Sequence, residues 1–217
     1  MSQTLTLVCI SDTHGSHRDF EVPNGDILLH AGDISGRGEW ETIEDFNQWL
    51  GELPHRHKVV IAGNHDFCFE KEPEKARGML TNCIYLQDEE VEIEGLRIYG
   101  SPWQPWFYDW AFNLQRGPEI RAKWELIPNG IDILVTHGPP KGHGDLTYVG
   151  KEQVGCEDLL KVIERIAPSY HVFGHIHEGY GTTNNGTTTF INASTCTLEY
   201  KPTNPPVVVS FTQSSSK

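Results

Sequence analysis

The sequence lacks the paired cysteines that build disulfide frameworks and thiolate metal sites. Five cysteines are present, an odd number. None of them forms a C-x-x-C pair, which argues against both a disulfide-rich secreted scaffold and a cysteine-ligated zinc site. We therefore expect free thiols in a reducing compartment. The cysteines are Cys9, Cys68, Cys83, Cys156 and Cys196.

Long apolar runs and a basic N-terminal segment are also missing. No apolar run approaches the roughly 20 residues that a membrane-spanning helix requires. Residues 1–10 have no basic start and continue directly into an apolar run, unlike a secretory signal. These absences predict a soluble, cytoplasmic protein without a membrane partner.

Positive charge is scarce in this chain. It has 17 Lys and Arg against 30 Asp and Glu, a formal net charge of −13. Such an excess of acid argues against a protein that binds nucleic acid polymers or anionic membranes through a basic surface. A small anionic substrate remains compatible with it, because bound metal ions reverse the local field.

Neither an internal repeat nor an interdomain linker is visible in the 217 residues. A chain of this length can bury its apolar residues in a single core. We expect one domain over residues 1–213 and a disordered Ser-rich tail over residues 214–217.

Short apolar runs alternate with helical patterns, which indicates an α/β fold. The segments 90–93 and 96–100 flank Glu94-Gly95 and predict a β-hairpin, so part of a sheet is antiparallel. Other predicted strands cover residues 5–10, 26–30, 58–62, 131–135, 170–173, 187–192 and 207–211. Predicted helices cover residues 40–50, 72–80, 119–126 and 156–166.

Several of the predicted strands end in polar residues that can bind metal ions. Open α/β sheets place ligands at such strand ends. Carboxylate, amide and imidazole groups suit Mn²⁺, Fe²⁺, Zn²⁺, Ni²⁺ and related ions such as Co²⁺. The set is larger than one ion takes from protein while leaving room for substrate, so two ions are expected, with Asp33 as the bridging carboxylate. The candidate ligands are Asp12, His14, Asp33, Asn64, His137, His175 and His177.

Three further residues are candidates for catalysis or substrate binding. His65 follows Asn64 and is expected to touch the substrate, as an acid toward the leaving oxygen or as a hydrogen-bond donor to the phosphoryl group. Asp66 is expected to orient the His65 ring. His143 lies in a Gly-rich loop soon after His137, and we consider it, with Asn64 and His65, as a substrate-binding candidate.

An aromatic-rich segment covers residues 101–112. Packing is its more common role, because Trp and Phe mostly bury area. A second possibility is that it forms a wall or lid of the site and stacks on a base or aryl group.

Taken together, the strand-end motifs resemble the signature of the calcineurin-like metallophosphoesterases. Segments 101–106, 136–140 and 174–180 further resemble the metallophosphoesterase-domain-containing proteins, which are related to the class III cyclic nucleotide phosphodiesterases. The motifs are, in order, Asp12-x-His14, Gly32-Asp33, Gly63-Asn64-His65-Asp66, His137 and Gly174-His175-x-His177.

The resemblance implies a sandwich of two mixed β-sheets flanked by helices, a dinuclear metal centre and a catalytic His65. It also implies two sets of ligands that share Asp33. One set is Asp12, His14, Asp33 and His177, and the other is Asp33, Asn64, His137 and His175.

The expected activity is hydrolysis of a small phosphodiester, such as a cyclic nucleotide or an aryl diester, by a metal-bridging hydroxide, with Mn²⁺ as the expected metal. One alternative is a phosphomonoesterase, including a protein phosphatase. However, Gly36 stands where the serine/threonine phosphatases of this fold have the second Asp of Gly-Asp-x-x-Asp-Arg-Gly, and Asp66 replaces their Glu. The other alternative is a non-catalytic metal-binding scaffold for protein interaction.

Overall fold

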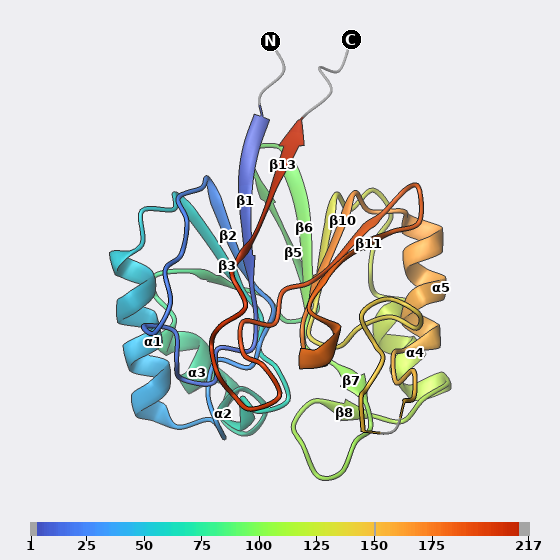
Figure 1. The fold of residues 1–217 in the computed structure, drawn as a ribbon, viewed down its shortest axis with the longest axis horizontal. Coiled ribbons are helices and arrows are strands. Elements are labelled where there is room, and N and C mark those ends of the chain that lie inside the picture. Colours follow the sequence, from blue (N-terminus) through green and yellow to red (C-terminus); the bar gives the residue numbers. More distant parts are fainter. Residues whose placement is uncertain (1–3, 150, 213–217) are drawn as a thin grey trace.

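Two β-sheets pack face to face in the middle of the molecule, and helices cover their outer faces (Figure 1). The arrangement is that of a computed structural model, which describes residues 4–149 and 151–212. It confirms the expected α/β sandwich of two mixed sheets flanked by helices. The tail predicted at residues 214–217 lies outside the described residues.

The first sheet has five strands in the order β13-β1-β2-β3-β4. Strands β1 to β4 run parallel, and β13 pairs antiparallel with β1. The strands are β1 (Thr4–Ile10), β2 (Ile27–His30), β3 (His57–Val60), β4 (Ile84–Tyr85) and β13 (Val207–Thr212).

The second sheet has six strands in the order β11-β12-β10-β9-β6-β5. Its four middle strands are parallel and its two edge strands are antiparallel. The predicted hairpin is confirmed as the β5–β6 pair. The strands are β5 (Glu89–Ile93), β6 (Leu96–Ser101), β9 (Ile133–Thr136), β10 (Tyr170–Phe173), β11 (Gly181–Asn184) and β12 (Thr189–Asn192), and a separate short pair is formed by β7 (Gln104–Pro105) and β8 (Asn113–Leu114).

The helices divide into two groups, one on each side of the sandwich (Figure 1). Helices α1, α2 and α3 pack against the first sheet, and α4 and α5 pack against the second. The helices are α1 (Trp40–Glu52), α2 (Phe67–Lys71), α3 (Pro73–Met79), α4 (Pro118–Trp124) and α5 (Glu157–Ile166), with a 3₁₀ turn η1 (His177–Gly179) after β10.

Strand β1 shows how the apolar runs serve both sides of a sheet. Side chains alternate between the two faces of a strand. Leu5 and Leu7 therefore join the core between the sheets, while Val8 and Ile10 pack under the helices. Because both faces are covered, the strand is apolar almost throughout instead of alternating with polar residues.

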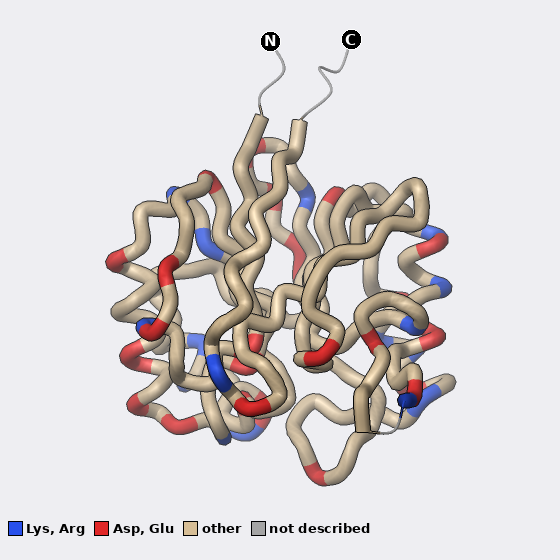
Figure 2. Tube along the Cα trace, viewed as in Figure 1, with Lys and Arg blue, Asp and Glu red and all other residues tan. Residues whose placement is uncertain are grey.

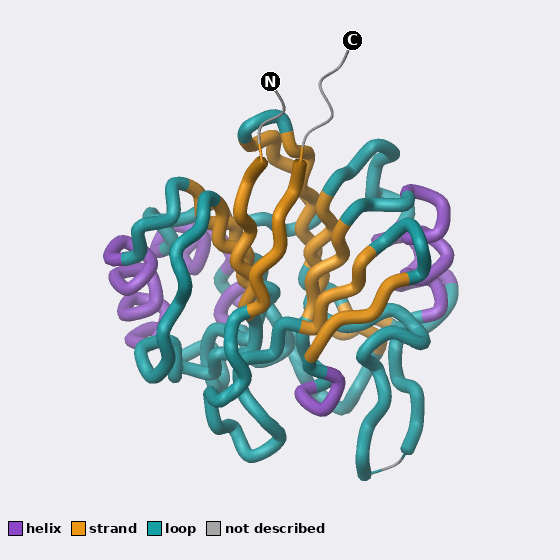
Figure 3. The backbone as a smooth tube through the Cα atoms, turned by 45° about the horizontal axis from the view of Figure 1, so that its top comes forward, coloured by secondary structure: helices purple, strands orange, loops and turns teal. Residues whose placement is uncertain are grey.

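The parallel strands of both sheets end at the same edge of the sandwich, where long loops gather (Figure 3). Basic and acidic residues are interspersed over the outer helices, so the negative charge is spread along the chain (Figure 2). Among the described residues, no helix is long and apolar enough to cross a membrane.

Candidate metal centre

Loops from both sheets supply the candidate ligands. Strands β1, β2 and β3 of the first sheet and β9 and β10 of the second end at this edge, and each is followed by a polar cluster. The structure brings these clusters together. The residues concerned are Asp12, His14, Asp33, Asn64, His137, His175 and His177.

One group of donor atoms gathers around Asp12. Its Oδ1 lies 3.3 Å from Nε2 of His177 and 4.0 Å from Nε2 of His14. The two imidazole Nε2 atoms are 3.2 Å apart. Two ring nitrogens and a carboxylate oxygen thus converge in a space suited to one cation.

A second group gathers around Asn64. Its Oδ1 lies 2.8 Å from Nε2 of His137 and 2.7 Å from Nδ1 of His175. An amide oxygen and two imidazole nitrogens suit a borderline divalent ion. The carboxylate that faces this group also faces the first group.

Asp33 is that shared carboxylate. Its Oδ2 lies 3.4 Å from Nε2 of His137 and 3.8 Å from Nε2 of His14, so it faces both groups. Its Oδ1 accepts a hydrogen bond of 2.8 Å from the backbone N–H of His65. The side chain is almost completely buried, which fixes its position between the groups.

Backbone carbonyls orient two of the histidine rings. Nδ1 of His137 donates to the carbonyl of Ala31 at 2.9 Å, and Nδ1 of His177 donates to the carbonyl of Thr197 at 2.9 Å. A carbonyl only accepts, so the proton is on Nδ1 in the neutral ring and Nε2 is available as a ligand atom. Second contacts of this kind commonly position metal-binding histidines.

The two carboxylates shift the pKa values of the histidines that they face. Burial lowers the pKa of His137, but the charge of Asp33 and a hydrogen bond to it raise the net value to about 9. Burial likewise opposes protonation of His177, but the hydrogen bond and charge of Asp12 raise its pKa to about 9. His175, whose burial dominates, has its pKa lowered to about 3.

The backbone at the centre is strained in several places. Four non-glycine residues have left-handed φ angles, a conformation that clusters at functional sites. Gly174 is required for a different reason, because a Cβ there would collide with the side chains of Ser11 and Asp12. The strained residues are Asp12 (φ 54°), His14 (45°), Asp33 (57°) and His175 (67°).

Gly63 also serves close packing. It is not among the described glycines with positive φ. A Cβ at this position would collide with Asp33 and would lie 2.6 Å from Cε1 of His137. The lack of a side chain therefore lets the β3 loop approach the shared carboxylate.

His65 lies beside the two groups with one nitrogen already engaged. Its Nδ1 donates to the carbonyl of Gly36 at 2.7 Å, and its ring stacks on Trp110 with centroids 4.2 Å apart. Its Nε2 is 3.9 Å from Oδ2 of Asp33. The ring is therefore held with Nε2 directed toward the Asp33 carboxylate.

The expectation that Asp66 orients the His65 ring directly is wrong. The Gly36 carbonyl takes that position. Asp66 is buried beneath the loops, where its two oxygens accept from the backbone N–H groups of Ile34, Ser35 and Gly63 and from the Ser35 hydroxyl. Its bonds to Ile34 and Ser35 hold the turn that leads to Gly36.

His143 is not brought to the candidate ligands. Its ring stacks on Phe190 of β12 at 3.6 Å between centroids, and Nδ1 lies 2.8 Å from the hydroxyl of Thr183 on β11. These contacts hold the ring against the second sheet. The expectation that His143 faces the substrate is therefore not supported.

The aromatic segment divides between packing and exposure. Phe112 is completely buried, as expected for packing, but Trp106 and Phe107 are each 52% exposed and Tyr108 is 66% exposed. Trp110 packs on His65. The expectation of packing is thus wrong for residues 106–108, of which Phe107 lines the cavity at the metal centre.

Three residues that follow β12 also contribute to the centre, and the sequence motifs did not indicate them. The Ser194 hydroxyl donates to Oδ2 of Asp12 at 2.9 Å, and Thr197 supplies the carbonyl that orients His177. The ring of Tyr200 lies 4.8 Å from that of His14. No motif marks these residues, since a Ser, a backbone carbonyl and a lone Tyr in a turn carry no recognisable spacing.

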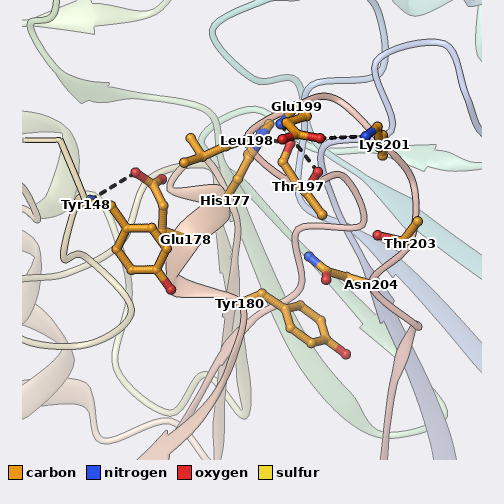
Figure 4. Close-up of a pocket in the computed structure, with 10 residues that line it drawn as sticks. All are labelled: Tyr148, His177, Glu178, Tyr180, Thr197, Leu198, Glu199, Lys201, Thr203 and Asn204. Carbon is orange, nitrogen blue, oxygen red and sulfur yellow. Dashed lines mark hydrogen bonds and ion pairs between the residues drawn. The ribbon is translucent and has the colours of Figure 1, made fainter.

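Described residues line three cavities at the centre and beside it. A central cavity of about 170 Å³ is lined by Asp33, Asn64, His65 and Tyr200, among others. A larger cavity of about 590 Å³ borders His177. Figure 4 shows its polar lining, in which Glu178 and Lys201 stand on opposite sides. A third, mainly apolar cavity of about 300 Å³ borders His175.

Comparisons of the sequence with known proteins identify its family. Residues 5–179 match the family model of the calcineurin-like phosphoesterases. Human metallophosphoesterase domain-containing protein 1 is 49% identical, with 93% of this chain and 69% of the relative covered. The UPF0046 protein C25E10.12 of Caenorhabditis elegans is 43% identical, with 93% of this chain and 79% of the relative covered.

A comparison with solved structures supports the fold. The protein TT1561 of Thermus thermophilus superposes with a TM-score of 0.57, at 14% identity, over 88% of this chain and 89% of its own. An identity this low bears on the architecture alone. The loop that carries Thr197 and Tyr200 lies beyond the residues that the family model matches.

Proposed function

Since the chain belongs to the calcineurin-like phosphoesterase family, we propose that it hydrolyses small phosphodiesters at a centre of two divalent metal ions. The position of Asp33 is the observation that carries this proposal. Its one buried carboxylate faces donor atoms on both sides, Nε2 of His14 and Nε2 of His137. A bridging carboxylate between two ions has this arrangement.

The donor set fits such ions. Asp12, His14 and His177 would hold one ion and Asn64, His137 and His175 the other, with Asp33 shared. All the donors are oxygen or neutral nitrogen, which suits Mn²⁺, our proposed metal, as well as Fe, Zn, Ni and Co. When bound, a pair of ions polarises the phosphoryl oxygens and activates water.

The protein's own contribution to the reaction centres on His65. With Nδ1 committed to the Gly36 carbonyl, only Nε2 can serve the substrate. The protonated ring donates from Nε2 to the oxygen that leaves phosphorus, or to a phosphoryl oxygen as charge builds there. Trp110 on one face of the ring and His14 at its edge limit its rotation.

The cavities favour a diester over a monoester. The cavity at His177 and the apolar cavity at His175 each share residues with the central one, and the shared residues differ: the first shares His177, Glu178 and Leu198, and the second shares Phe107 and His175. A phosphodiester carries two substituents on phosphorus and can use both spaces. A monoester would fill only one of them. A nucleotide diester is one member of the proposed substrate class.

The proposal is tested with Mn²⁺-loaded protein, bis(p-nitrophenyl) phosphate as the diester and p-nitrophenyl phosphate as the monoester. We expect turnover of the diester with the higher kcat/KM. His65→Ala should lower kcat by about 10²- to 10⁴-fold, the usual contribution of a general acid. Metal analysis should give two ions per chain in both proteins.

A matched control is His57→Ala, since His57 begins β3, at the end of the strand away from the ligand loop, and is paired there with Glu94. It should leave kcat within about twofold of the parent, as expected for a surface change. Higher kcat/KM for the monoester would favour the phosphomonoesterase. Two bound ions with turnover of neither substrate would favour the non-catalytic scaffold.

A further inference from the structure

The apolar cavity beside the metal centre has a lining unlike that of its neighbours. It measures about 300 Å³, and we call it the aromatic cavity. An apolar cavity of about 150 Å³ can hold a benzene molecule, so there is room here for a substituted or fused ring. Its lining residues include Pro105, Trp106, Phe107, Arg116, Pro139 and Ile176.

We propose that the aromatic cavity binds an aromatic ester group of the substrate while the phosphoryl group occupies the central cavity. The inference rests on the proposed phosphoesterase function and specifies its substrate. The two cavities are adjacent, because Phe107 and His175 line both. A ring attached to a phosphoryl oxygen at the metal centre is therefore placed in the neighbouring aromatic cavity.

The exposed rings of Trp106 and Phe107 provide the binding surface. When a ligand ring covers aromatic side chains that are half exposed to water, the removal of apolar surface from water favours binding. The loop that carries them is anchored: the Trp106 N–H donates to the Leu114 carbonyl at 2.8 Å, and Nδ2 of Asn113 donates to the Tyr108 carbonyl at 2.6 Å. Ordering this loop around a ligand thus costs little additional entropy.

Arg116 sets the charge preference of the aromatic cavity. Its guanidinium is held by the carbonyls of Val154 and Gly155, the latter at 2.8 Å from Nη1. The residue therefore presents a positively charged group at a fixed place in a mainly apolar lining. This arrangement disfavours a cationic substituent and favours a ring that carries hydrogen-bond acceptors.

The test compares two non-hydrolysable ligands that differ only in the ring. Phenylphosphonate and methylphosphonate have the same anionic head group, and their dissociation constants for Mn²⁺-loaded protein are measured by calorimetry. We expect phenylphosphonate to bind about tenfold more tightly, a size typical of one aromatic contact. Trp106→Ala should reduce this ratio to below about threefold and leave methylphosphonate binding unchanged, while Trp106→Phe should retain most of it.

Leu126→Ala is the control, because Leu126 is similarly exposed, at 56%, but lies on the turn after α4. It should leave both constants unchanged. Equal affinities in the parent protein, or a Trp106→Ala variant that weakens both ligands alike, would overturn the assignment. If the protein turns over the diester but binds the two phosphonates with equal affinity, the role proposed for the aromatic cavity is wrong and the proposed hydrolysis stands. If the expected ratio of dissociation constants is found but no ester is turned over, the proposed hydrolysis is wrong and the role of the cavity stands.

Discussion

The Asp66 side chain does not line the space between the candidate metal ligands. It nevertheless connects two of the loops that carry them. Its side chain is completely buried. Burial and the charge of Asp33 raise its pKa to about 6, while hydrogen bonds from Gly63, Ser35 and Ile34 favour the carboxylate. Because all of these partners donate hydrogen bonds, both oxygens of the Asp66 side chain must accept them. The carboxylate thereby joins the β2 loop, including the turn to Gly36, to the β3 loop that carries His65.

We predict that Asp66→Asn destabilises the protein by about 2–4 kcal/mol and lowers kcat as well. The amide has one acceptor oxygen, so its NH₂ group must face backbone N–H groups that remain buried without a partner. The Gly36 carbonyl should then shift and leave His65 less well oriented. Urea unfolding measures the first effect and diester turnover at low temperature the second.

Ser35→Ala is the matched control, since it removes one donor to the same carboxylate and the acceptor of the Gly38 N–H, but leaves no donor facing another donor. Its cost should be about 1–2 kcal/mol. A smaller loss of stability in Asp66→Asn than in Ser35→Ala would show that the neighbouring N–H groups do not require a carboxylate at this position.

At the level of elements, the sequence predicted the strands that carry the site because their signal is local. An apolar run followed by Asp, Asn or His is visible without knowing the fold, and parallel strands bring such ends to one edge. Strand β11 (Gly181–Asn184) was missed, because it is an exposed edge strand of polar residues. Its pairing with β12 is set by neighbours in space.

Partners that act through backbone atoms were beyond the reach of sequence patterns. The carbonyls of Gly36 and Thr197 orient His65 and His177, but any residue has a carbonyl. The direction of such a group depends on how a loop is packed against other elements. For the same reason the contact that orients the His65 ring was predicted for Asp66, whereas the Gly36 carbonyl makes it.

Helix α1 supports the loops of the first sheet through Phe46, which is completely buried. Its ring lies 5.0 Å from the ring of His30 at the end of β2 and 5.5 Å from that of Trp49. We predict that Phe46→Ala costs about 3–5 kcal/mol of stability by leaving a cavity between helix and sheet. Thermal and urea unfolding of the metal-loaded protein measure this loss.

The control is Gln48→Ala on the exposed face of the same helix. It should change stability by no more than about 0.5 kcal/mol. Because Phe46 touches none of the candidate ligands, the folded fraction of Phe46→Ala should keep its metal content. Loss of metal from a fully folded variant would contradict this separation of core and site.

For the molecule as a whole, the buried charges at the centre couple metal binding, protons and stability. In the metal-free protein, the imidazolium groups of His137 and His177 face Asp33 and Asp12. The pKa of each histidine is raised to about 9 from an ordinary value of 6.5. These pairs therefore stabilise the metal-free fold fully below pH 6.5 and lose their contribution as the pH rises through about 9.

Metal binding should reverse this dependence on pH. Nε2 of each ring must lose its proton before it can bind a cation, so binding near pH 7 should release about two protons, and the apparent affinity should rise up to about pH 9. Mn²⁺ titrations by calorimetry in buffers of different ionisation enthalpy give the number released. The same titration at pH 9, where each ring is already about half neutral, is the control and should release about one proton fewer. Equal proton release at both pH values would show that these carboxylates do not hold the two histidines in their charged form.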